Sequence, residues 1–206
     1  MTPPLSASDE RLVELVSAVA RRDWEGLAEL RRGAPEGEPD ERWREALIQS
    51  HLFLGFPSIV EAFEVISREG GMHAPTEPEH ENPGTDFEAQ GAPIFDGIYA
   101  DLAPVVRRRL AQHHPDFAHW IAEHAYGRVL ARPGLTAAMR ELLAIVCLLH
   151  TNLDRQLASH TRGAVRLGAS AHAVHEVFKL VSPHLDAEDS VRLAEVIERF
   201  LPTEES

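Results

Sequence analysis

The chain has 206 residues, 44% of them hydrophobic, and a formal net charge of -13 at pH 7. This length and composition suffice for one compact domain, or for two halves that share a core. The negative charge disfavours nucleic acid and anionic lipid surfaces as partners, because only Arg107–Arg109 form a basic cluster above the acidic background.

Apolar segments are short throughout the sequence. The longest, Leu142–Leu149, has eight residues, well below the roughly 20 that a membrane-spanning helix requires. The first residues lack the charged-then-apolar pattern of a signal peptide. Cys147 is the only cysteine, which excludes a disulfide or a two-cysteine redox pair within one chain. We therefore expect a cytoplasmic protein that does not enter a membrane.

Hydrophobic residues recur at intervals of about three to four residues, which predicts an all-α fold. The expected helices cover residues 8–32, 40–67, 94–112, 116–131, 136–150, 153–167, 171–182 and 187–200. The intervening segment 68–93 is rich in Gly, Pro and Glu and has little apolar content. It is therefore expected to be a flexible linker.

Two parts of the chain resemble each other. With an offset of 130 residues, apolar positions of segment 12–34 recur in segment 142–164, and both segments end in Arg-Gly-Ala. With an offset of 131, positions of segment 45–66 recur further along the chain in the same way. Such self-similarity indicates duplication of one helical unit, although amphipathic helices also match by chance. We interpret residues 1–67 as a degenerate first copy and residues 94–206 as a second copy.

Two ionisable residues, Glu141 and His160, interrupt the apolar helical stripes of the second copy. The first copy has Arg11 and Leu30 at these positions, and Leu30 marks the position of His160 as facing inward. A partly buried carboxyl and imidazole group can be shifted toward neutral pKa values and serve as a general acid and base. The alternatives are a simple ion pair, or a core histidine whose hydrogen bonds are satisfied and which has no catalytic role.

Four further residues are candidates for lining a substrate cavity around this pair. The guanidinium of Arg132 or Arg162 could bind a substrate carboxylate. Arg132 lies in a turn, however, and an arginine also occupies the position of Arg162 in the first copy. Tyr126 and His51 could contact the substrate or simply pack.

Neither a metal nor an organic cofactor is expected. Among the twelve histidines, His172 and His175 share a helical face, but the sequence places no third ligand beside them. A phosphate-binding glycine loop and a Gly-x-Ser-x-Gly motif are also absent from the sequence.

The sequence is similar to the carboxymuconolactone decarboxylase-like proteins, which include alkyl hydroperoxidase D. The similar segments are HPDFAHWIAEHAYGRVLARPGL at 114–135, RELLAIVCLL at 140–149, QLASHTRGAVRLGAS at 156–170 and WREALIQSHLFLGFPSIVEAF at 43–63. This resemblance implies a helical protein without metal or cofactor. It also implies a homo-oligomer, with a trimer favoured, whose sites for a small-molecule substrate or ligand lie between packed helices.

The resemblance implies one of two activities. Hydroperoxidase D proteins use a Glu, a Cys-x-x-Cys pair and a His; Glu141 and His160 match, but Leu153 and Gln156 occupy the cysteine positions. Peroxide reduction requires those thiols, and Cys147 lies in an apolar helical run, so this activity is disfavoured. The decarboxylase branch agrees better, and implies a lyase that decarboxylates a small carboxylated lactone or related acid. A non-catalytic oligomer that binds a small ligand is the alternative.

Overall fold

The structure is a computed structural model that describes residues 5–73, 75–77, 82 and 84–201. Within these residues it is helical and contains no strand, which confirms the predicted all-α fold. No helix of the described part is long and apolar enough to cross a membrane. The chain begins with α1 (Ala7–Arg21), α2 (Trp24–Arg32), α3 (Asp40–Leu54) and α4 (Phe56–Arg68).

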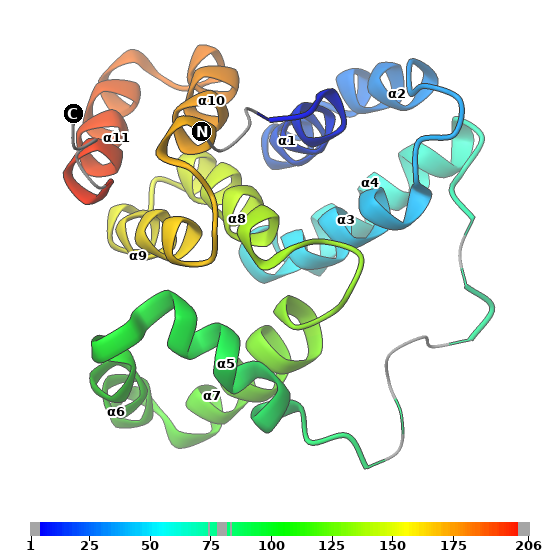
Figure 1. Cartoon of the computed structure of the whole chain (residues 1–206). Helices are drawn as coiled ribbons and strands as arrows, with labels where there is room; N and C mark the ends of the chain where they lie inside the picture. Colours follow the sequence, from blue (N-terminus) through cyan, green and yellow to red (C-terminus); the bar gives the residue numbers. More distant parts are fainter. Residues whose placement is uncertain (1–4, 74, 78–81, 83, 202–206) are drawn as a thin grey trace.

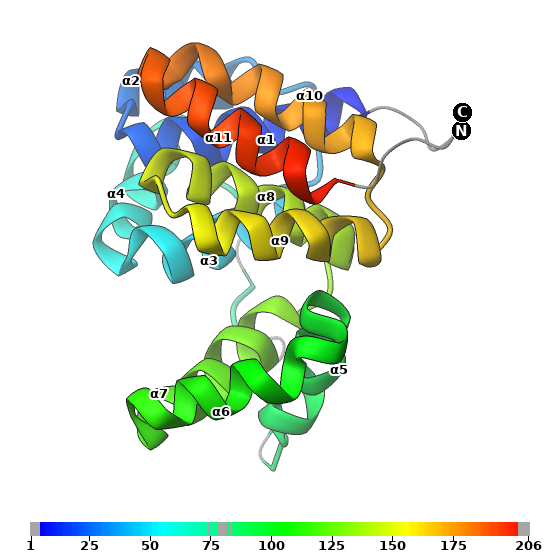
Figure 2. The same cartoon turned by 90° about the vertical axis from the view of Figure 1, so that its left-hand side faces the viewer.

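The middle of the chain forms a separate layer below the other helices (Figure 2). A second hydrophobic cluster, which includes Phe95, Ile98 and Tyr126, holds this layer together. Its elements are α5 (Phe87–Tyr99), the short 3-10 helix η1 (Ala100–Leu102), α6 (Ala103–His113), α7 (Pro115–Trp120) and the π-helix η2 (Ile121–Leu130). The rest of the chain comprises α8 (Ala137–Thr151), α9 (Asp154–Arg166), α10 (Ala171–Val181), the 3-10 helix η3 (Ser182–His184) and α11 (Ala187–Phe200).

The helices α8 to α11 repeat the order and spacing of α1 to α4. The first two helices of each set begin 130 residues apart, and the last two begin 131 residues apart. The packing is reciprocal, because α1 contacts α10 while α8 contacts α3, and α1 and α8 contact each other (Figure 1). We propose that the two sets are two copies of one helical unit.

Helix α8 lies at the centre of the main hydrophobic core. Every residue from Met139 to Leu149 is buried, because α1, α3, α9 and α10 surround this helix. A helix enclosed in this way is expected to be apolar on all sides, and only Arg140 and Glu141 interrupt the apolar run from Met139 to Leu149. Glu141 therefore lies on the most buried helix of the described structure.

Two of the expected long helices are divided. The helix predicted at 8–32 breaks at Arg22, which has φ 57, and Asp23 caps the new helix by accepting a hydrogen bond from the Gly26 amide. The helix predicted at 40–67 breaks at Gly55, whose φ of 79 favours glycine. Each break turns the chain so that both halves can pack on the core.

The predicted linker 68–93 extends too far toward the C-terminus. Residues 87–93 form the first half of α5, whose first turn is capped by the Asp86 side chain. Gly91 is buried where α5 crosses η2, and a Cβ there would lie 2.4 Å from the Gly127 nitrogen. Gly91, one of the glycines that suggested a linker, therefore allows two helices to cross closely. We propose that the second unit begins near Phe87.

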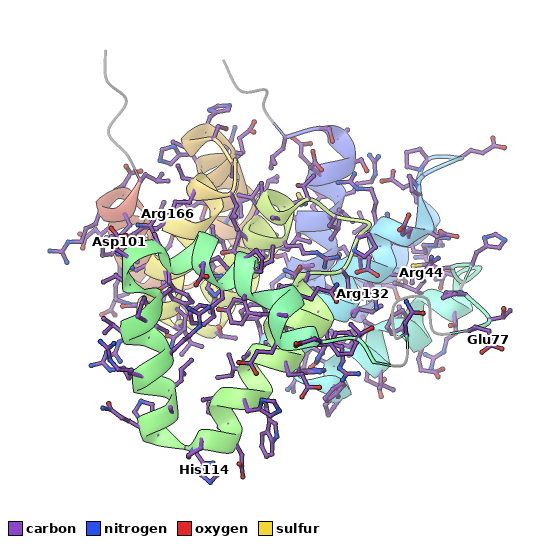
Figure 3. The ribbon with its side chains drawn as sticks, turned by 60° about the horizontal axis from the view of Figure 1, so that its bottom comes forward. Arg44, Glu77, Asp101, His114, Arg132 and Arg166 are labelled. Carbon is purple, nitrogen blue, oxygen red and sulfur yellow. The ribbon has the colours of Figure 1, made fainter. Side chains whose placement is uncertain are left out.

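The segment 116–131, expected as one α-helix, consists of α7 followed by the ten-residue π-helix η2. The turn between α6 and α7 is formed by His114, whose backbone is extended and which lies at the tip of this helix pair (Figure 3). Long π-helices are rare and commonly occur at functional sites. Here η2 forms one wall of the cavity described below.

Candidate functional site

Glu141 and His160 are directly paired. Oε2 of Glu141 lies 2.8 Å from Nδ1 of His160, and both side chains are buried. The two residues are brought together by the tight turn between α8 and α9, in which Asn152 takes a left-handed conformation with φ 56. Antiparallel packing of α8 and α9 then places residues that are 19 apart in the sequence side by side.

Two tyrosines lie near this pair. The hydroxyl groups of Tyr99 and Tyr126 form a hydrogen bond of 3.2 Å. Burial raises the pKa of Tyr126 well above its ordinary value, and the phenol of Tyr99 and the charge of Glu141 raise it further. Burial also raises the pKa of Tyr99. Both phenols therefore stay protonated near neutral pH; Tyr126 donates its proton to Tyr99, which leaves the Tyr99 hydroxyl available as a hydrogen-bond donor.

One oxygen of the carboxylate remains unused. Oε1 of Glu141 is buried and accepts no hydrogen bond within the described residues. Buried polar atoms are rarely left in this state, and such an atom usually has a functional reason or a small bound partner. The carboxylate thus holds His160 through Oε2 and keeps further acceptor capacity through Oε1.

A cavity of about 640 Å³ lies beside His160, between helices α3 and α9 and the layer formed by α5 to η2. The wall from α9 consists of Arg155, Gln156, Ser159 and His160. The wall from α6 consists of Val106, Arg109, Leu110 and His113. Helix η2 adds Ile121, His124, Ala125, Tyr126 and Leu130, and the end of α3 adds Leu52 and Phe53.

The cavity brings together only part of the residues that were predicted to line it. His160 and Tyr126 do line it. Glu141 does not reach the cavity and lies behind His160. His51 also lies behind the wall, with its Nε2 2.8 Å from Nε2 of His124 and its ring stacked on Phe56 at a centroid distance of 4.5 Å.

The two predicted substrate arginines lie elsewhere. Arg132, labelled in Figure 3, pairs with the buried carboxylate of Glu45, with an Nη2 to Oε1 distance of 2.7 Å. Arg140 binds the same carboxylate at 2.8 Å. The guanidinium of Arg162 lies over the ring of Phe200 at 4.5 Å. Arg132 is thus engaged in an ion pair and Arg162 in contact with an aromatic ring, and neither lines the cavity.

The cavity wall also contains residues that were not predicted from the sequence to belong to the site. Arg109, Arg155 and Tyr99 line it. The spacing of Val106, Arg109, Leu110 and His113 on α6 is that of one helical face, and could have indicated a shared environment. That this face of α6 lines the same cavity as α9 depends on the tertiary fold, which the spacing does not show.

Leu153 and Gln156, which occupy the two cysteine positions of hydroperoxidase D proteins, lie in different environments. Gln156 lines the cavity, whereas Leu153 is 47% exposed just before α9. Cys147 is buried, and burial raises the pKa of its thiol to about 12. This thiol is therefore protonated and unreactive near neutral pH. The described residues contain no cluster of His, Cys, Asp and Glu that could hold a metal ion.

The C-terminal part of the chain is similar to a known protein family. Residues 115–198 match the model of the carboxymuconolactone decarboxylase family, which confirms the resemblance predicted from the sequence. The matched segment includes Glu141 and His160. The chain is also 26% identical over 133 residues to Peroxisomal protein 2 of Schizosaccharomyces pombe. The match covers 64% of the chain and 62% of that relative, so less than two thirds of the relative's length is spanned.

Proposed function

We propose that the cavity is the active site of a carboxymuconolactone decarboxylase-like carboxy-lyase that acts on a small carboxylated lactone or a related acid. The observation that carries this proposal is the 2.8 Å contact between Glu141 and Nδ1 of a histidine that lines the cavity. Because Nδ1 is engaged, Nε2 is the nitrogen available to a ligand. His160 is then the catalytic residue, and Glu141 is a positioning residue.

The proposed chemistry needs one proton. When the carbon to carbon dioxide bond breaks, its electron pair passes into the conjugated lactone carbonyl, and Nε2 of the His160 imidazolium donates a proton to carbon. The Glu141 carboxylate stabilises this imidazolium and holds its ring orientation, as carboxylates commonly do for catalytic histidines. His160 regains a proton from solvent. Tyr126 donates its hydroxyl proton to Tyr99, and Tyr99, which also lines the cavity as a protonated phenol, could donate a hydrogen bond to the carbonyl oxygen.

A substitution taken from the first unit tests this role. His160→Leu places the residue of position 30 at the equivalent position of the second unit, and should lower the rate of carbon dioxide release from a responsive lactone acid by roughly 10² to 10⁴-fold. His172→Leu is the matched control, because His172 is exposed on α10 outside the cavity. Turnover that persists undiminished in the His160 variant would contradict the assignment.

A non-catalytic ligand-binding oligomer is the alternative function. It predicts ligand binding by the wild-type protein without turnover of any lactone acid tested, and unchanged binding in Glu141→Gln. A thiol peroxidase is disfavoured by the pKa of Cys147. Cys147→Ala should therefore leave any reaction with peroxide unchanged, as measured by peroxide consumption in the presence of a dithiol.

We further propose that the protein is a cytoplasmic homo-oligomer, with a trimer favoured. Two large apolar side chains near the cavity are strongly exposed, namely Phe56 at 65% and Trp120 at 61%. Exposed apolar groups of this size are common at interfaces between protein chains. Light scattering should give a mass of three chains, and a monomer at micromolar concentration would contradict the proposal.

A further inference from the structure

The charge of the cavity wall is opposite to that of the whole protein. The chain has 33 acidic residues against 20 Lys and Arg. The cavity wall nevertheless contains two arginines, three histidines and no acidic side chain; these basic residues are Arg109, His113, His124, Arg155 and His160. A local excess of positive charge favours an anionic ligand in the cavity, because the basic groups of the wall attract it.

The two arginines have no acidic partner. Most arginines of the described chain pair with Asp or Glu, as Arg107 does with Asp96 at 2.7 Å. Neither Arg109 nor Arg155 forms an ion pair or a side-chain hydrogen bond with any described residue, although each contributes to the cavity wall. A guanidinium is a planar donor that matches a carboxylate with two parallel hydrogen bonds. These two groups are therefore suited to receive the ligand's charge.

The positions of Arg155 and His160 define how a ligand must lie. Arg155 and Arg109 are exposed, whereas His160 is buried, so the arginines lie nearer to solvent than His160. Arg155 precedes His160 by five residues on α9, which separates their Cα atoms by about 7.5 Å along the helix axis. A carboxylate at Arg155 is thus remote from the atom that meets Nε2 of His160.

The rest of the cavity wall is mostly apolar. Phe53, Leu110 and Leu130 line it together with the aromatic ring of Trp120. A volume of about 640 Å³ is in the range that drug-sized ligands occupy, and exceeds what a small lactone acid fills. Apolar wall area of this kind gains free energy by contact with a hydrocarbon or aromatic body.

We propose that the cavity binds an amphipathic carboxylate, with one carboxylate group held by Arg109 and Arg155 and the apolar body extending toward His160. This inference rests on the proposed function only because both use the same cavity. It adds that the anchoring carboxylate is not the group lost at His160, so a substrate of the proposed lyase carries a second carboxyl group there. Binding does not require proton transfer, so it can be tested separately.

Calorimetric titration with sodium octanoate, 1-octanol and octyl phosphate tests the ligand class. The wild-type protein should bind octanoate at least ten-fold more tightly than octanol, which has the same chain without the charge. Equal affinities for octanoate and octanol, or no binding of octanoate, would overturn the proposal. Tighter binding of octyl phosphate would overturn the choice of carboxylate.

Substitution of both arginines tests their role. Arg109→Gln/Arg155→Gln should weaken octanoate binding by roughly ten-fold or more and leave octanol binding unchanged. Arg108→Gln is the matched control, because Arg108 is exposed on α6 but does not line the cavity. Unchanged octanoate affinity in the double variant would overturn the assignment. His160→Leu should still bind octanoate, which separates this inference from the proposed catalytic role.

Discussion

Gly163 lies so close to Glu141 that a side chain at this position would displace the carboxylate. A Cβ on Gly163 would lie 2.7 Å from Oε2 of Glu141, the oxygen that binds His160, and 3.0 Å from Cγ2 of Ile98. Gly163 is one turn from His160 on α9, so the lack of a side chain there is what admits the carboxylate. The contact between Glu141 and His160 thus depends on a third residue, Gly163, which has no side chain.

Gly163→Ala should therefore lower both stability and turnover. Alanine is the better helix former by about 1 kcal/mol, so a substitution without steric conflict would stabilise α9. We expect instead a loss of about 1–3 kcal/mol, typical of an overpacked core, in urea unfolding. Gly33→Ala is the control from the first unit, because its Cβ would meet no side chain and only the carbonyl oxygens of Glu29 at 3.3 Å and Leu30 at 3.9 Å. Equal effects of the two substitutions would show that Glu141 is not displaced.

The buried ion pairs of Glu45 predict sensitivity to acid. Burial opposes the charge of Glu45, but hydrogen bonds from Arg132 and Arg140 outweigh it and lower the pKa of this carboxyl. A carboxyl whose folded pKa is lowered contributes stability above its unfolded pKa of about 4.3, and this contribution is lost as the pH falls through the folded value. Glu45→Gln should cost about 3–5 kcal/mol at pH 7. The difference in melting temperature from the wild-type protein should shrink below about pH 4.3; a constant difference from pH 7 to pH 3 would contradict this.

His150 predicts a second loss of stability at a higher pH. Burial lowers the pKa of His150 to about 4, and the charges of Arg21 and His184 add to the effect. Its Nε2 lies 2.9 Å from the Ser17 hydroxyl of the first unit. Since an unfolded histidine titrates near pH 6.5, the unfolded chain binds the proton first, and stability falls between about pH 6.5 and pH 4. The loss is at most about 3 kcal/mol.

His150→Gln tests this assignment, because glutamine keeps a hydrogen-bonding group and does not titrate. Urea unfolding at pH 7 and pH 4.5 should show a smaller pH dependence in the variant than in the wild-type protein. The titration of His150 can also be followed directly by NMR. A midpoint near pH 6.5 for its imidazole resonances would show that this side chain is not desolvated.

Much of the fold could be predicted from the sequence, because helical periodicity and the 130-residue offset are local or repeated signals. The comparison of His160 with Leu30 indicated an inward position correctly, and the buried pair with Glu141 followed from it. The helix breaks were harder to predict. Arg22 adopts a left-handed conformation that a non-glycine residue rarely takes, and its neighbours have an uninterrupted helical pattern.

The cavity wall could not be predicted in the same way. Arg132 binds Glu45, which is 87 residues away in the sequence, so its engagement in a buried ion pair becomes visible only in the fold. Arg109 and Arg155 have the polar pattern of any exposed helix face. Their common environment arises because α6, in the middle layer, faces α9 of the second unit across the cavity.

The Glu141 and His160 pair can be separated into its catalytic and structural contributions by a double-mutant cycle. Each single change to leucine removes one partner of a buried hydrogen bond and leaves the other without compensation, which costs about 1–3 kcal/mol or more if the remaining group is charged. Glu141→Leu/His160→Leu removes both polar groups, and such replacements are often neutral or stabilising. We therefore expect the double variant to melt at a higher temperature than either single variant while it has no turnover of a lactone acid. If the pair has only a structural role, the double variant should instead recover ligand-dependent function together with stability. Additive losses in the cycle would show that the two side chains do not interact as the 2.8 Å contact indicates.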